Sequence, residues 1–198
     1  DGLGVGLKAL AAVGATAFAF KGIVATTARF EDLRTTLTSV TGSVNAGADA
    51  FKDISKFATS TQFGIEELTN TYIKLKTAGI EPTEALLTTF TDTAAVTTDQ
   101  IGTLEAMTDL FSRTISGGLG LEELNRLADR GVPVFRILEQ QMGLTRLEVA
   151  EFGKTAEGAQ KITAALTKGL NSEFGGATQD RLKNLSVSMD NFGIATKQ

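Results

Sequence analysis

Two pairs of adjacent glutamates, Glu66-Glu67 and Glu122-Glu123, are the residues of this sequence best suited to chemistry. A carboxylate pair can supply the general acid and the general base of a hydrolase. Each pair also falls in the first turn of a predicted helix, where negative charge interacts favourably with the helix dipole. We therefore interpret both pairs as helix-start residues and predict that the chain has no catalytic residue.

The sequence contains no histidine and no cysteine. It therefore lacks thiol nucleophiles, imidazole bases, disulfides and the ligands that zinc, haem and copper sites need. Tryptophan is also absent and Tyr72 is the one tyrosine, which weakens the case for a sugar-stacking or base-stacking surface. We predict no metal site and no cofactor site.

Two further motifs are interpreted as structural features and not as binding sites. The run Gly117-Gly118-Leu119-Gly120 resembles a phosphate-binding loop, but neither a following Lys-Ser/Thr nor a preceding strand accompanies it. We expect it to be a flexible turn between helices. Asp129-Arg130 is expected to be a solvated helix end, because adjacent residues on a helix do not face each other.

Threonines are concentrated in one part of the chain and do not by themselves make an active site. We expect them to cover polar helix faces, at some cost in helix propensity. The residues concerned are Thr88, Thr89, Thr91, Thr93, Thr97 and Thr98.

The chain has 198 residues, a 42% apolar content and a net charge of −4, as expected for a folded and mildly acidic protein. Positive charge is concentrated in residues 1–30, where Lys8, Lys21 and Arg29 outnumber Asp1. No strongly basic face is implied, so we predict no sequence-specific binding to nucleic acid.

Apolar residues recur at helical spacing through most of the chain, and no segment alternates like a strand. The predicted fold is all-α, a compact or hinged module of several short capped helices, because glycines and prolines interrupt the pattern. The apolar stripes cover residues 30–40, 51–58, 65–75, 86–94, 101–115, 121–128, 134–142, 159–170 and 182–192.

Helix starts are marked by capping signals. Thr145 and Glu148 have the spacing of a capping box, and Thr97 with Gln100 has the same form. Gly64 and Gly120 each precede an apolar-Glu-Glu-Leu sequence, so two helices are expected to begin alike at these glycines.

Helix ends are marked by glycine followed by proline. Gly79 is predicted to be a left-handed cap, with Ile80 folding back on Leu75 and Pro82 opening the next helix. Residues 131–133, Gly-Val-Pro, are predicted to repeat this arrangement.

Residues 1–28 are predicted to form a separate apolar helix rich in Ala and Gly, preceding a helical domain over residues 29–198. Its uncharged run from Ala9 to Phe20 is shorter than the roughly 20 residues that cross a bilayer. Small residues at Ala11, Ala15 and Ala19 allow another helix to approach closely. Two interpretations remain open: a helix buried within or between protomers, or a membrane-active segment.

Several short sequence segments along residues 29–198 occur in an order that is informative when they are taken together. They are Arg29 to Arg34 with Val40-Thr41-Gly42, Phe57 to Leu68, Tyr72 to Lys76 with Gly79-Ile80, Asp92 to Ala95, Leu124 to Pro133, Met142 to Thr145 with Glu148-Val149, Phe174 to Ala177, and Leu182 to Leu185.

In this order the segments resemble the conserved helical region of phage tail tape measure proteins. The resemblance implies a structural virion protein in the lumen of the tail tube, which acts in tail assembly, length determination and genome delivery. It implies tail tube and tail tip proteins as partners, copies of itself, with a trimer favoured, and the host membrane and cell envelope after ejection. The helix breaks favour a compact module flanking the measuring rod over the rod itself. The alternatives are a helical adaptor or membrane-perturbing module and a carboxylate-dependent cell-wall hydrolase.

Overall fold

The computed structural model describes residues 28–184, which form helices joined by short turns and contain no strand. Helical residues in this range alone exceed half of the 198-residue chain, so the prediction of an all-α fold is confirmed. The helices are residues 28–41, α2 (Val44–Ala58), α3 (Ile65–Thr77), α4 (Glu84–Ala95), α5 (Gln100–Gly117), α6 (Leu121–Asp129), α7 (Val134–Met142), α8 (Arg146–Phe152), α9 (Ala156–Phe174) and residues 177–184.

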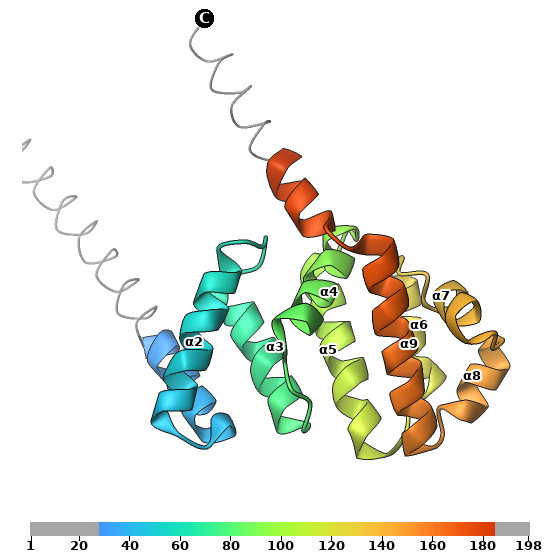
Figure 1. The fold of residues 1–198 in the computed structure, drawn as a ribbon, viewed down its shortest axis with the longest axis horizontal. Helices are drawn as coiled ribbons and strands as arrows, with labels where there is room; N and C mark the ends of the chain where they lie inside the picture. Colours follow the sequence, from blue (N-terminus) through green and yellow to red (C-terminus); the bar gives the residue numbers. More distant parts are fainter. Residues whose placement is uncertain (1–27, 185–198) are drawn as a thin grey trace, which may run out of the picture.

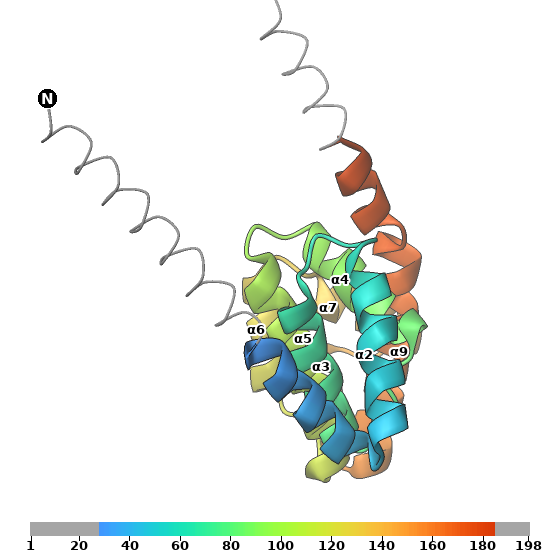
Figure 2. The same cartoon turned by 90° about the vertical axis from the view of Figure 1, so that its left-hand side faces the viewer.

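The helices lie side by side in a row, from residues 28–41 and α2 at one end to α7 and α8 at the other (Figure 1). Figure 2 shows helix 28–41 beside α2, where Phe30 and Phe51 meet edge to face at 6.1 Å between ring centroids. Near the middle, α5 contacts α3, α4 and α6, and α9 returns to contact α4, α5 and α7. Because α9 bridges elements distant in sequence, the row forms one packed body.

The apolar stripes predicted from the sequence make the core of this body. Leu68 and Leu75 of α3 are fully buried, as are Leu166 and Leu170 of α9. In α4, Phe90 is fully buried and meets the ring of Phe111 of α5 edge to face, 4.8 Å between centroids. Helical periodicity therefore identified the elements and most of their buried faces, although Ile101 and Ile115, at the two ends of the stripe over residues 101–115, are exposed.

The expectation that the central threonines cover polar faces is wrong for four of them. Thr89, Thr91 and Thr93 are buried because α4 packs against both α5 and α9. Thr97, just beyond the end of α4, is also buried, with its hydroxyl 2.9 Å from that of Thr103 on α5. Their hydroxyls donate to backbone carbonyls three or four residues earlier, as Thr93 does to Thr89 at 2.7 Å. The polar atoms are thus satisfied within the chain. Thr98 is exposed as expected.

Most predicted helix starts are confirmed. Gly64 and Gly120 are the N-caps of α3 and α6, both with extended backbone. Thr145 and Glu148 form a complete capping box at α8, where the backbone N–H of Thr145 donates to the Glu148 carboxylate at 2.8 Å. This bond and the Thr145 hydroxyl lower the pKa of Glu148.

The predicted start residues of two helices, α5 and α4, are wrong. The N-cap of α5 is Asp99, whose carboxylate accepts from the N–H of Gly102 at 3.0 Å. Thr97 instead donates to the Ala94 carbonyl at the end of α4, where a hydroxyl satisfies a carbonyl that has no helical donor. Pro82 does not open α4, because the hydroxyl of Thr83 is the cap and Pro82 precedes it.

The glycine stops are confirmed. Gly79 has φ +83°, and the N–H of Ile80 donates to the Leu75 carbonyl at 2.9 Å, which closes α3 with a Schellman turn. Gly131 has φ +88°, and the N–H of Val132 donates to Leu127 in the same way at the end of α6. The residue after this turn, Pro133, is the N-cap of α7.

The predicted apolar helix over residues 1–28 lies outside the described residues except for its last position, and so does the part of the final stripe beyond residue 184. Helix 28–41 continues without a break across the proposed boundary between residues 28 and 29. The division of the chain at this point stays a prediction.

Replacing Thr145 by Ala is expected to lower the free energy of unfolding by about 1 kcal/mol, because α8 loses its N-cap. The effect should be local, so hydrogen exchange of residues 146–150 should accelerate while α5 stays protected. Thr98→Ala is the matched control, since Thr98 is exposed and caps no helix. Equal exchange at residues 146–150 in both variants would contradict the assigned cap.

Candidate functional site: a groove between α2 and α4

The two glutamate pairs lie in the first turns of α3 and α6, as predicted. Glu66 pairs with Arg29 of helix 28–41 at 3.3 Å, and Glu122 pairs with Arg126 one turn along α6 at 2.8 Å. Both are surface ion pairs between side chains that are about half exposed or more. Such exposed ion pairs are expected of residues at helix starts. The carboxylate pair of a hydrolase would instead lie in a cleft.

Glu123 differs from the other three glutamates because it is buried. It is 7% exposed, and its carboxylate accepts from Arg113 of α5 at 2.7 Å. The neighbouring turn between α5 and α6 is also anchored, since the N–H of Leu119 donates to the Gly153 carbonyl at 2.7 Å. The glycine run is therefore an interhelical turn, as predicted, but one held against the end of α8.

Asp129 and Arg130 do not pair with each other. Arg130 lies 3.5 Å from the carboxylate of Asp99, the N-cap of α5, and it donates to the carbonyl of Arg126. The expectation of a purely solvated helix end is wrong for Arg130, which links the end of α6 to the start of α5.

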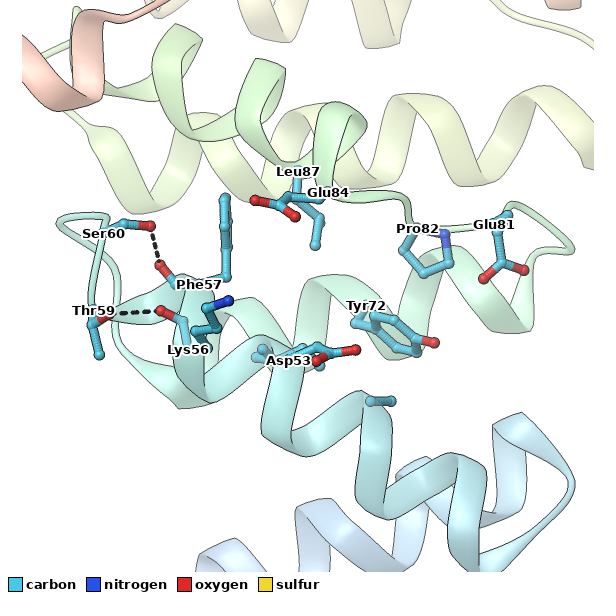
Figure 3. A pocket seen from close by; sticks show the side chains of 12 residues that line it. Asp53, Lys56, Phe57, Thr59, Ser60, Tyr72, Glu81, Pro82, Glu84 and Leu87 are labelled. Atoms are coloured by element: carbon cyan, nitrogen blue, oxygen red, sulfur yellow. Dashed lines mark hydrogen bonds between the residues drawn. The ribbon is translucent and has the colours of Figure 1, made fainter.

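A groove of about 490 Å³ opens between α2 and α4, with Tyr72 of α3 along it. Its apolar surface includes Ile54, which is 2% exposed, and Leu87, which is 4% exposed. Figure 3 shows Phe57 extending from α2 toward α4, and Asp53 beside Tyr72 on the opposite side of the space from Glu84. The complete lining is Ala50, Asp53, Ile54, Lys56, Phe57, Thr59, Ser60, Tyr72, Glu81, Pro82, Glu84 and Leu87.

The rim of the groove carries more negative than positive charge. Asp53, Glu81 and Glu84 are exposed on it, and Lys56 is its one basic lining residue. Burial raises the pKa of Tyr72, which further favours the protonated hydroxyl. A hydrogen bond to Glu81 raises the pKa of Lys76, which keeps that ion pair charged beside the groove.

These groups suit binding better than catalysis. An apolar floor ringed by charged side chains is typical of a binding surface. Among residues 28–184, no cluster of three or more acidic side chains is placed to hold a metal ion. The sequence did not reveal the groove, because its walls come from three helices whose contact depends on the intervening turns.

Comparison with known proteins decides the family. The family model for the tape measure protein matches residues 21–197. The chain belongs to the tape measure protein family. A relative from Haemophilus influenzae, described as Mu-like prophage FluMu protein gp42, is 30% identical over an alignment of 184 residues that covers 91% of this chain and 28% of the relative. No solved structure matches.

Membership of the tape measure family supports a structural role connected with the phage tail and a location in the virion tail. Both the family and the relative favour a structural over an enzymatic protein. The chain spans less than a third of the relative's length, so roles of a complete tape measure protein are proposals for this segment. Within residues 28–184, none of the helices has the length and apolar character needed to cross a membrane.

Replacing Glu123 by Gln is expected to lower the free energy of unfolding by about 1–2 kcal/mol, because Arg113 loses the charge of a buried partner. The matched control is Glu122→Gln, whose exposed ion pair contributes about 0.5 kcal/mol. Urea denaturation of both variants measures this difference, and equal losses would contradict the role assigned to Glu123.

The same pair of variants, with Glu66→Gln and Glu67→Gln, tests the hydrolase alternative in a peptidoglycan-release assay. We expect no release by the unmodified chain and none by the variants. Release that disappears in one of them would overturn the interpretation of these glutamates as helix-start residues.

Proposed function

We propose that this chain is a structural segment of a tail tape measure protein, which lies in the lumen of the tail tube and acts in tail assembly, length determination and genome delivery. The observation that carries the proposal is the family match over residues 21–197, on a body whose polar residues cap helices and join them. Glu123, Glu148 and the buried threonines of α4 make contacts within the fold, which favours an assembly role.

The packed shape favours a place next to the measuring rod over a place within it. A measuring rod gains length in proportion to its residues, whereas α9 folds back on α4, α5 and α7 and shortens the body. The segment is therefore proposed to be a compact unit next to the rod, where it contacts tail tube and tail tip proteins.

The test is an in-frame deletion of residues 28–184 in a phage that carries the gene, followed by electron microscopy of the tails. We expect tail assembly to fail, or complete tails without a proportional change in length. A continuous helix of this range would be about 240 Å long at 1.5 Å per residue. Infectious particles with tails shortened by about that amount would assign the segment to the rod and contradict the proposal.

A second part of the proposal concerns the apolar segment at residues 3–28. Fully burying one large apolar side chain contributes roughly 1.5–3 kcal/mol, so the segment can drive association. We propose that it packs against copies of itself, in a trimer, or against a tail partner, and contacts the host membrane after ejection. The large apolar residues concerned are Leu3, Val5, Leu7, Leu10, Val13, Phe18, Phe20, Ile23 and Val24.

Deleting residues 1–28 is expected to shift the chain from an oligomer to a monomer in sedimentation velocity and to remove leakage of liposomes. The complete 198-residue chain is the reference in both assays. If both forms are equally monomeric and equally inert toward lipid, the segment has neither role.

A further inference from the structure

The helix over residues 177–184 is joined to the rest of the body by a turn of two glycines, Gly175 and Gly176. Gly176 has φ +88°, which glycine adopts without strain. Figure 1 shows the short helix leaning away from the axis of α9 and over the end of α4. We call residues 177–184 the terminal arm.

Asp92 of α4 holds the start of the terminal arm. This aspartate is 2% exposed, and its two carboxylate oxygens accept from the N–H groups of Gly176 at 2.8 Å and Thr178 at 2.9 Å. The carboxylate therefore caps a helix that begins more than eighty residues later in the chain. Its negative charge lies at the positive end of that helix dipole.

Arg181 and Gln179 also attach the arm to the body. Arg181 donates to the Ala95 carbonyl at the end of α4 at 2.8 Å, and its guanidinium also faces the side-chain amide of Gln100 on α5. Gln179 donates to the Ser60 carbonyl after α2 at 3.0 Å. The attachments thus reach three different elements, and each is a polar contact.

Apolar burial holds the arm much less than it holds α9. In the arm Thr178 is buried and Leu182 is half-buried, while Gln179, Arg181 and Lys183 are exposed. Four residues of α9, by contrast, are completely buried: Ala159, Ile162, Leu166 and Leu170. A segment with few buried apolar contacts opens at a lower free energy than the core does.

We propose that the terminal arm is a latched joint, which swings open as one unit about Gly175-Gly176 while α9 and the core stay folded. Asp92 is the latch. In the closed arrangement its two hydrogen bonds fix the direction of the arm's helix relative to α4. In the open arrangement that direction is free and the Asp92 carboxylate is hydrated. This proposal concerns the joint alone and does not depend on the role proposed for the whole chain.

Hydrogen exchange on the complete 198-residue chain tests the latch. Asp92→Asn keeps the shape of the side chain but presents an amide N–H₂ to one of the two backbone donors. We expect the amides of residues 176–182 to exchange about ten- to hundredfold faster, while Leu166 and Leu170 of α9 keep their rates. Unchanged exchange of the arm, or an equal acceleration in α9, would overturn the proposal.

The matched control is Asp180→Asn, which removes an exposed carboxylate of the arm itself and its 3.6 Å pair with Lys183. We expect no acceleration in this variant, and acceleration equal to that of Asp92→Asn would overturn the assignment of the latch. Arg181→Gln offers a second route if Asp92→Asn fails to fold, because it removes an exposed side chain. This variant should also accelerate exchange in the arm alone, and unchanged exchange would count against the proposal.

A distance measurement separates opening from local fraying. The chain contains no cysteine, so Lys183→Cys with Thr98→Cys introduces one pair of spin labels at exposed positions. One narrow distance distribution is expected on the otherwise unchanged chain, and a second, longer population when Asp92→Asn is added. The same narrow distribution in both would show that the arm does not swing.

Discussion

Phe90→Ala is expected to lower the free energy of unfolding by about 3–5 kcal/mol, the usual range for removing a buried phenylalanine. Phe90 is fully buried in α4, and α4 packs against both α5 and α9. Its ring also meets Phe111 edge to face at 4.8 Å between centroids. Such an aromatic pair adds to the stabilisation that comes from burying apolar area. The cavity therefore opens where three helices meet.

Urea denaturation followed by circular dichroism measures the loss. Phe152→Ala is the matched control, because Phe152 ends α8 and is 36% exposed. The same chemical change there should cost about 1–2 kcal/mol, because about a third of Phe152 is already exposed and its removal at the surface leaves no enclosed cavity. If the two variants lose equal stability, α4 is not the packed centre of the body.

The helices themselves were predictable because each carries enough apolar residues at helical spacing to mark one buried face. The stripe ending in Leu166 and Leu170 identified α9, and Thr145 with Glu148 marked the start of α8. These signals are local, since capping and periodicity involve residues three or four positions apart. The packing of the helices on one another is a different kind of information.

The burial of the α4 threonines illustrates the difference. A threonine in a helix is compatible with a polar surface or with a buried site where its hydroxyl donates to an earlier carbonyl. Thr93 takes the second option and is fully buried, because α4 packs against both α5 and α9. Nothing within one turn of Thr93 distinguishes the two cases.

The groove and the Asp92 latch could not be predicted from the sequence for the same reason. Asp92 lies among threonines and alanines, a context without any charged neighbour on α4 near it in sequence. Its partners, Gly176 and Thr178, are 84 and 86 residues away. A single sequence carries no signal for such a contact, since it arises only after α9 has returned to the centre of the body.

Gly158→Ala is expected to lower the free energy of unfolding by about 3 kcal/mol, because the added methyl group has no room. A Cβ at Gly158 would lie 1.7 Å from the carbonyl oxygen of Phe152, which ends α8. That atom belongs to the backbone, so relieving the overlap requires α8 and α9 to move apart. Helix propensity alone predicts the opposite sign, a gain of about 1 kcal/mol for Ala over Gly.

The sign of the change therefore distinguishes tertiary packing from local propensity. Gly64→Ala is the matched control, since Gly64 has ordinary backbone angles and its Cβ would meet only the side-chain carboxylate of the half-buried Glu67, at 2.7 Å. A side chain can yield, so the expected loss there is about 1 kcal/mol or less. Thermal and urea denaturation of both variants measure the difference. Stabilisation by Gly158→Ala would mean that α8 does not lie against the start of α9, and the short connection at residues 153–155 would then have to follow another path.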